Sequence, residues 1–114
     1  MKTALLASRQ LTSSDHYEQI SAALLELGTT ELHHGNEGAG KQHAERWATE
    51  TGNPEHGHAP NWKGYGRAAG PIRGKKLITA VENVLALWDG KSKGTEQELK
   101  EAKRQGKRVR LILV

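Results

Sequence analysis

The chain lacks cysteine and phenylalanine, and it holds only one methionine and three prolines. The absence of cysteine excludes a disulfide framework and thiolate metal sites, and it fits a cytoplasmic protein. No apolar run approaches the roughly eighteen residues of a transmembrane helix, so we expect no membrane partner. The apolar run in MKTALLAS is too short for a signal peptide and is typical of a buried strand. Without phenylalanine, the core has to be built from leucine, alanine, valine, isoleucine and three tryptophans.

The length of 114 residues predicts one domain that spans residues 1–114. The formal net charge of +4 raises the question of a nucleic-acid partner. Near the C-terminus, however, basic residues alternate with acidic ones in TEQELKEAKRQGKR, a pattern typical of the solvated face of a helix. We therefore expect a small anionic ligand in preference to a nucleic acid.

Hydrophobic patterns divide the chain into alternating strands and helices. The run NVLALW is the clearest buried strand, and GTEQELKEAKRQG is a capped helix that ends at Gly106. Gly28 and Gly52 end two earlier helices, and Pro71 lies where a helix could begin, because its missing N–H costs nothing in the first turn. The predicted strands are 2–7, 30–34, 54–60, 83–88 and 107–114, and the predicted helices are 12–27, 41–52, 72–81 and 94–106.

This order of elements predicts the fold class. Parallel strands need crossover connections, so strand–helix alternation indicates a parallel sheet with helices on both faces. Right-handed crossovers make it an α/β, Rossmann-like, doubly wound sheet of about five strands. Ligands bind such sheets beyond the carboxyl ends of the strands, where the strand order reverses.

The loops that leave these strand ends hold much of the glycine. After the fourth strand, Gly90 and Gly94 let the backbone approach a ligand closely, and Thr95 could cap the next helix. The free N–H groups at that helix start form an anion site, which Lys91 and Lys93 reinforce. The alternative is an ordinary loop with a helix cap. In the same way, HHGNEGAGK at 33–41 is either a ligand cradle after a strand or a bare turn.

Two stretches carry specific motifs, GRAAGPIR at 66–73 and WDGKSKGT at 88–95. Together with ASR at 7–9, HHGNEGAG at 33–40 and AERWA at 44–48, they resemble the YspA-like branch of the SLOG superfamily. This Rossmannoid group contains the Lonely Guy and Smf/DprA-type domains, and the resemblance covers nearly the whole chain. It implies a domain that binds a nucleotide or a nucleotide-derived molecule at the strand ends.

The resemblance also implies one candidate activity. In the Lonely Guy enzymes, a GGxGTxxE loop and an arginine support release of a base from a nucleoside monophosphate. Gly94, Thr95 and Glu98 match the end of that motif, and Arg73 resembles the arginine. The alternative function is therefore a phosphoribohydrolase that cleaves the N-glycosidic bond, in which Glu98 stabilises an oxocarbenium-like centre or activates water.

Departures from the family pattern favour binding over catalysis. Asn36 and Gly40 stand where relatives often carry aspartate, and Gly74 replaces the asparagine of PIRN. The loop GKSKGT lacks the paired glycines of the enzymes. What remains is a basic, glycine-lined pocket that suits a phosphate-rich ligand. We therefore expect a non-catalytic binder of an ADP-ribose-like or cyclic nucleotide signal, acting as a sensor or a sequestering protein in phage defence or its evasion.

Several side chains leave alternatives open. Arg9 ends the central strand and would contact a phosphate or form a structural salt bridge. Arg73 is a cation near a helix start, which is unfavourable for the helix dipole and indicates a role toward the ligand. Trp62 could stack on a base or cover the edge of the core. We also expect a homo-oligomer. The predicted ligand-binding residues are Ser8, Arg9, His34, Gly35, Asn36, Gly38, Trp62, Arg67, Arg73, Asp89, Gly90, Lys91, Ser92, Lys93, Gly94, Thr95 and Glu98.

The histidines raise the question of a metal. His33 and His34 are adjacent on a predicted strand and point to opposite faces, so they are not expected to share one ion. His56 and His58 alternate and could do so, but no carboxylate spacing supports them. We therefore expect neither a metal nor a cofactor, and we expect one of His33 and His34 to face the pocket rim as a hydrogen-bond donor.

Overall fold

The computed structural model describes residues 1–8, 11 and 16–114. Its strands are β1 (Lys2–Ala7), β2 (Glu31–His34), β3 (Glu55–Gly57), β4 (Asn83–Trp88) and β5 (Arg108–Leu113). Its helices are α1 (Tyr17–Glu26), α2 (Gly38–Thr51), α3 (Trp62–Tyr65), the 3-10 turn η1 (Gly66–Ala68), α4 (Ala69–Thr79) and α5 (Lys93–Arg104). The predicted Arg9 and residues 12–15 of the first predicted helix lie outside the described residues.

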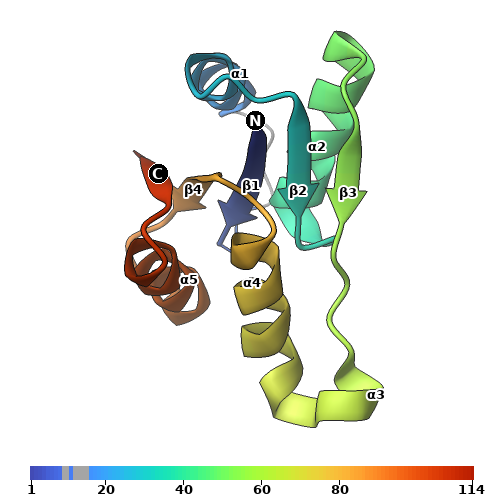
Figure 1. The fold of residues 1–114 in the computed structure, drawn as a ribbon, viewed down its shortest axis with the longest axis vertical. Coiled ribbons are helices and arrows are strands. Elements are labelled where there is room, and N and C mark those ends of the chain that lie inside the picture. Colours follow the sequence, from blue (N-terminus) through green and yellow to red (C-terminus); the bar gives the residue numbers. More distant parts are fainter. Residues whose placement is uncertain (9–10, 12–15) are drawn as a thin grey trace.

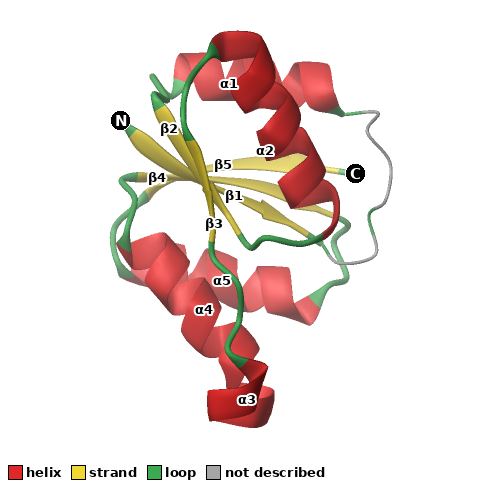
Figure 2. Ribbon diagram, turned by 90° about the vertical axis from the view of Figure 1, so that its right-hand side faces the viewer, coloured by secondary structure: helices red, strands yellow, loops and turns green. Residues whose placement is uncertain are grey.

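The described strands form one sheet in the order β3-β2-β1-β4-β5, and every neighbouring pair is parallel. Helices α1 and α2 cover one face of the sheet, and α4 and α5 cover the other (Figures 1 and 2). The predicted Rossmann-like, doubly wound α/β fold is confirmed. From β1 the chain proceeds through β2 to β3 at one edge of the sheet, and from β4 it proceeds to β5 at the other edge. The strand order therefore reverses between β1 and β4, which lie side by side.

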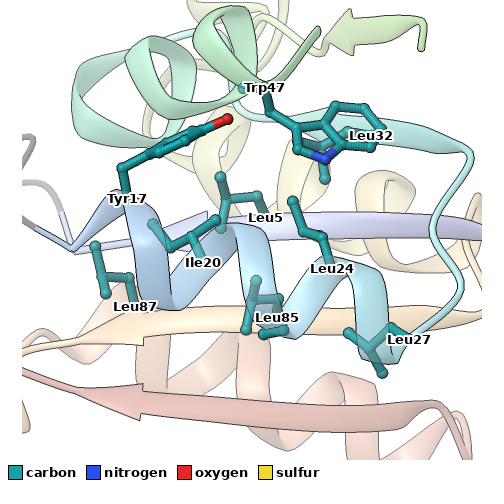
Figure 3. Close-up of a cluster of buried hydrophobic side chains, with 11 residues drawn as sticks. Leu5, Tyr17, Ile20, Leu24, Leu27, Leu32, Trp47, Leu85 and Leu87 are labelled. Carbon is teal, nitrogen blue, oxygen red and sulfur yellow. The ribbon is translucent and has the colours of Figure 1, made fainter. Parts of the chain in front are cut away.

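One core lies between the sheet and helices α1 and α2. Leu5 and Leu85 are register partners on β1 and β4, and both are at most 1% exposed. Figure 3 shows both leucines in one cluster with Ile20 and Leu24 of α1 and Trp47 of α2. Burial of one such leucine contributes about 1.5–3 kcal/mol, so this cluster fixes both helices on the sheet.

A second core lies on the opposite face because successive strand residues point to opposite sides. Ala4 and Leu6 flank Leu5 on β1 and pack against Leu77 of α4 and Leu99 of α5. The two helices are thereby held side by side at the reversal of strand order.

The structure differs from the predicted boundaries at several elements, and the predicted strand 54–60 is reduced to the three residues of β3. Helix α2 begins at Gly38, so the glycine stretch forms its first turn after an extended Glu37. The predicted loop 61–67 contains α3, where the Asn61 side chain caps the helix by accepting the Gly64 N–H at 3.0 Å. Helix α4 begins at Ala69, which leaves the proline at 71 within the first turn. No helix in the described part of the chain is long and apolar enough to cross a membrane.

Candidate functional site

A cleft of about 570 Å³ lies between α4 and α5, beyond the carboxyl end of β1. Ala7 forms its floor at the end of that strand, and Trp62 of α3 lies on its wall. A neighbouring cleft of about 460 Å³ also includes Ala7 and Trp62, and extends toward Ser8 and Gly38. Both clefts lie where the doubly wound topology predicts a ligand. We call the first the α4–α5 cleft.

Arg73 is the most strongly positioned cation of the α4–α5 cleft. Its Nη1 donates to the Gly35 carbonyl at 2.7 Å, and its Nη2 lies 3.4 Å from Oε1 of Glu37. The side chain is only 12% exposed, and within the described residues its buried Nε has no hydrogen-bond partner. Arg73 is therefore a largely buried, permanent cation on the wall of the cleft with one N–H unsatisfied by those residues.

Gly35 makes this arrangement possible. An ideal Cβ at residue 35 would lie 2.5 Å from Nη1 of Arg73 and 3.1 Å from its Cζ, so a side chain there would force the guanidinium to move. The absence of a side chain at Gly35 therefore lets the guanidinium of α4 reach the turn between β2 and α2.

The N-terminus of α5 forms the opposite wall of the cleft. The helix begins after Ser92, whose side chain makes no capping bond, and the Glu96 N–H makes the first backbone bond to the Ser92 carbonyl at 3.1 Å. The N–H groups before Glu96 have no intrahelical partner, and Gly94 and Thr95 line the cleft. The sequence predicted that Thr95 could cap this helix. In the structure Ser92 holds the N-cap position, and Thr95 lies inside the first turn, where it is 3% exposed.

The loop before α5 is held by Asp89 and Trp88. Oδ1 of Asp89 accepts the N–H groups of Lys91 and Ser92 at 2.8 Å each, and Trp88 Nε1 donates to the Ser92 carbonyl at 3.0 Å. The N–H groups of Ser92 and Lys91 lower the pKa of the Asp89 carboxyl below its ordinary value of 3.8. The Ser8 hydroxyl lies 3.3 Å from Asp89 Oδ1 and joins the ends of β1 and β4.

The Glu98 side chain packs against Gly74 of α4. An ideal Cβ at residue 74 would lie 2.9 Å from Oε2 of Glu98, so the glycine leaves room for this carboxylate against α4. Arg73, the neighbour of Gly74, lines the same cleft. The two residues that resemble the functional pair of the Lonely Guy enzymes therefore share one cavity.

The structure separates the predicted site residues into three groups. Those that line the α4–α5 cleft are Trp62, Arg67, Arg73, Ser92, Gly94, Thr95 and Glu98. Ser8 and Gly38 line the neighbouring cleft. The predicted site residues within the described part of the chain that line neither cleft are His34, Gly35, Asn36, Asp89, Gly90, Lys91 and Lys93. Gly35 and Asp89 instead support residues that do.

The two adjacent histidines lie away from the cleft rim. His34 is 1% exposed; its Nε2 contacts the Glu55 carboxylate, and its Nδ1 accepts the Asn36 N–H at 3.0 Å. His33 points to the other face of β2, where its Nδ1 lies 2.8 Å from Nε2 of His58. Burial lowers the pKa of both His33 and His58 below 6.5. These histidines shape the β2–β3 edge of the sheet.

The cleft is less basic than the sequence predicted. Three cations and three carboxylates line it, and Lys91 and Lys93 do not take part. Sequence reasoning missed Glu37, Lys75 and Glu101. Glu101 lies three residues after Glu98 on α5 and therefore on the same side of the helix, so this spacing could have revealed it. Glu37 could not be found this way, because only the tertiary structure brings it to α4.

Comparisons of this chain with protein-family models, with curated proteins and with solved structures gave no match. The resemblance to the SLOG superfamily therefore rests on the motifs of the sequence alone.

Proposed function

We propose that this protein binds a nucleotide-derived, phosphate-bearing small molecule in the α4–α5 cleft without transforming it. The ligand is of the ADP-ribose-like or cyclic nucleotide type. On this proposal, the protein belongs with the YspA-like SLOG domains and acts as a sensor or a sequestering protein for such a signal in phage defence or its evasion.

The observation that carries the proposal is the largely buried Arg73 guanidinium on the wall of the cleft. A phosphate bound there could draw on this cation and on the N–H groups at the start of α5, because Arg73, Gly94 and Thr95 line the same cleft. The side chain is preorganised by Gly35 and Glu37, so little conformational entropy would be lost on binding.

The lining also offers contacts for the rest of such a ligand. Trp62 is 48% exposed and lies on the walls of both clefts, where its ring could stack on a base. The carboxylates of Glu98 and Glu101 could accept hydrogen bonds from ribose hydroxyls. A mixed lining of this kind suits a molecule with a phosphate at one end and a nucleoside at the other better than a bare polyphosphate.

The second candidate is a phosphoribohydrolase. It is favoured by one observation, namely that Arg73 and Glu98 line the same cleft. In that reaction Arg73 would hold the phosphate, and Glu98 would stabilise positive charge at the anomeric carbon or activate water.

One experiment separates the two functions. The purified protein is incubated with nucleoside monophosphates, ADP-ribose derivatives and cyclic nucleotides, and binding is followed by thermal shift and calorimetry. The bound molecule is then released by heat and identified by mass. Recovery of the intact molecule supports a binder, whereas recovery of free base and ribose phosphate supports the hydrolase. The absence of any thermal shift across the panel would contradict both functions.

A variant pair tests the role of Arg73. A hydrogen bond to a charged group contributes about 1.5–3 kcal/mol, so Arg73→Gln should weaken ligand binding about ten- to hundredfold. Arg108→Gln removes the same charge from an exposed position on β5 and should leave the affinity unchanged. Equal affinity of the two variants would place the ligand elsewhere. Circular dichroism of both variants verifies that the fold is kept.

We also propose that the chain self-associates. The edge strand β5 supports this, because Leu111 and Leu113 are 45% and 67% exposed on it. Exposed apolar residues on an unpaired strand edge favour pairing with a second chain.

A further inference from the structure

A second cluster of polar side chains lies at the β2–β3 edge of the sheet and does not line either cleft. Glu31 and His33 alternate on β2 and therefore point to the same face. His56 on β3 is the register partner of His33, which brings its side chain to that face as well. A carboxylate and two imidazoles thus meet although β2 and β3 are separated by a whole helix.

The donor atoms of this cluster are close enough to share one ion. One ligand atom from each of the three residues lies within 4.8 Å of the others. Oε1 of Glu31 is 2.7 Å from Nε2 of His56 and 3.5 Å from Nε2 of His33. Tetrahedral zinc with bonds of about 2.0–2.2 Å keeps its donor atoms about 3.3–3.6 Å apart. Small side-chain rotations would therefore bring all three donors to one centre.

The ring of His33 is largely buried, with 10% of the side chain exposed. Within the described residues its Nε2 makes no close hydrogen bond, and Oε1 of Glu31 lies 3.5 Å away. Its other ring nitrogen, Nδ1, lies 2.8 Å from Nε2 of His58. When Nδ1 donates its proton to His58, Nε2 keeps a lone pair for a metal, and Oε1 of Glu31 lies 3.5 Å from it. A metal-ligating histidine commonly donates its other ring N–H to an outer acceptor, and Nε2 of His58 would be that acceptor here.

We propose that Glu31, His33 and His56 form a binding site for a divalent transition metal of the Zn²⁺ type, with His58 as the residue that orients His33. Two imidazoles and one carboxylate suit zinc and its neighbours, whereas Mg²⁺ and Ca²⁺ require oxygen ligands. The site is open on one side, because the His56 side chain is 50% exposed, and this leaves a coordination position for water. Lys2 lies 3.9 Å from Oε2 of Glu31, so the carboxylate keeps Oε1 for the metal.

The metal would join β2 and β3, which pair over only three register positions. Strand β3 has only three residues, and it lies at the edge of the sheet. An ion held by both β2 and β3 would stabilise this edge by mass action, since it binds only the folded chain. The proposal does not depend on the ligand of the α4–α5 cleft.

The test uses the full chain, prepared without a polyhistidine tag and stripped with a chelator. Zn²⁺ binding is measured by competition with a chromophoric chelator, and Co²⁺ absorption reports the coordination geometry. We expect one Zn²⁺ per chain and a rise in melting temperature. Glu31→Gln and His56→Gln should each weaken binding at least about tenfold, and His58→Gln should weaken it by a similar or smaller factor.

His16→Gln is the matched control, because this histidine precedes α1 and lies outside the cluster. It should bind Zn²⁺ as the wild type does. His56→Gln decides the case even where His33→Gln does not fold, since His56 is half-exposed and its replacement leaves the core intact. Failure of the wild type to bind one Zn²⁺, or equal binding by His56→Gln and His16→Gln, would overturn the proposal.

Discussion

Replacement of Gly35 by alanine probes how the cleft holds its principal cation. The new Cβ would lie 2.5 Å from Nη1 of Arg73, so the guanidinium would have to leave the Gly35 carbonyl, to which it donates at 2.7 Å. No positive φ is involved at this position, so alanine can adopt the backbone conformation itself. The perturbation therefore acts through Arg73.

The magnitude follows from two opposing contributions. Loss of a hydrogen bond to a charged, largely buried group costs about 1.5–3 kcal/mol. Replacement of glycine by alanine lowers the conformational entropy of the unfolded chain, which stabilises the folded protein by about 0.4–1 kcal/mol. We expect Gly35→Ala to lower the free energy of unfolding by about 1–2 kcal/mol, which corresponds to a fall in melting temperature of about 4–8 °C.

Urea and thermal unfolding of a set of variants measure this effect. Gly94→Ala is the control, because a Cβ at residue 94 meets no atom within 4 Å, and this variant should be slightly more stable than the wild type. In the Arg73→Gln background, Gly35→Ala should cost far less, because the displaced guanidinium is already gone. Wild-type stability of Gly35→Ala, or an equal cost in both backgrounds, would refute the reasoning.

Two further predictions concern the core and the loop before α5. Leu85→Ala, at a fully buried position on β4, should lower the free energy of unfolding by about 2–5 kcal/mol in urea titrations, whereas Leu25→Ala, at a residue 82% exposed on α1, should change it little. Asp89→Asn should reduce stability above pH about 4, where the unfolded-state carboxyl is ionised. Because hydrogen bonds from Ser92 and Lys91 lower the folded-state pKa of Asp89, its deficit against the wild type should shrink as the pH falls through that lowered pKa; a deficit independent of pH would contradict this account.

Much of the candidate site could be predicted because topology and local motifs agree. The carboxyl ends of β1 and β4 had to lie side by side once the sheet was doubly wound, and Gly94 and Glu98 lie on one helix whose start the sequence marks. The mixed charge of the cleft could not be predicted. It depends on Glu37, which reaches Arg73 only because the turn after β2 packs against α4.

The histidines show the same division. Alternation along a strand correctly predicts that His33 and His34 face opposite sides, and each has its own partners. What the sequence pattern did not reveal is a carboxylate close to these histidines. Glu31 meets His56 through the register of β2 with β3, and no local pattern of the sequence encodes which residues of two strands become neighbours.

The sequence by itself determined the alternation of strands and helices, the parallel sheet and the edge at which a ligand should bind. These follow from periodicities of two and 3.6 residues and from the geometry of crossover connections, which act over short stretches of chain. Only the tertiary structure decided that Arg73 lies in the space left by Gly35 and that Glu31, His33 and His56 share one face. Strand register and helix packing place these side chains together, and both depend on contacts between residues far apart in the chain.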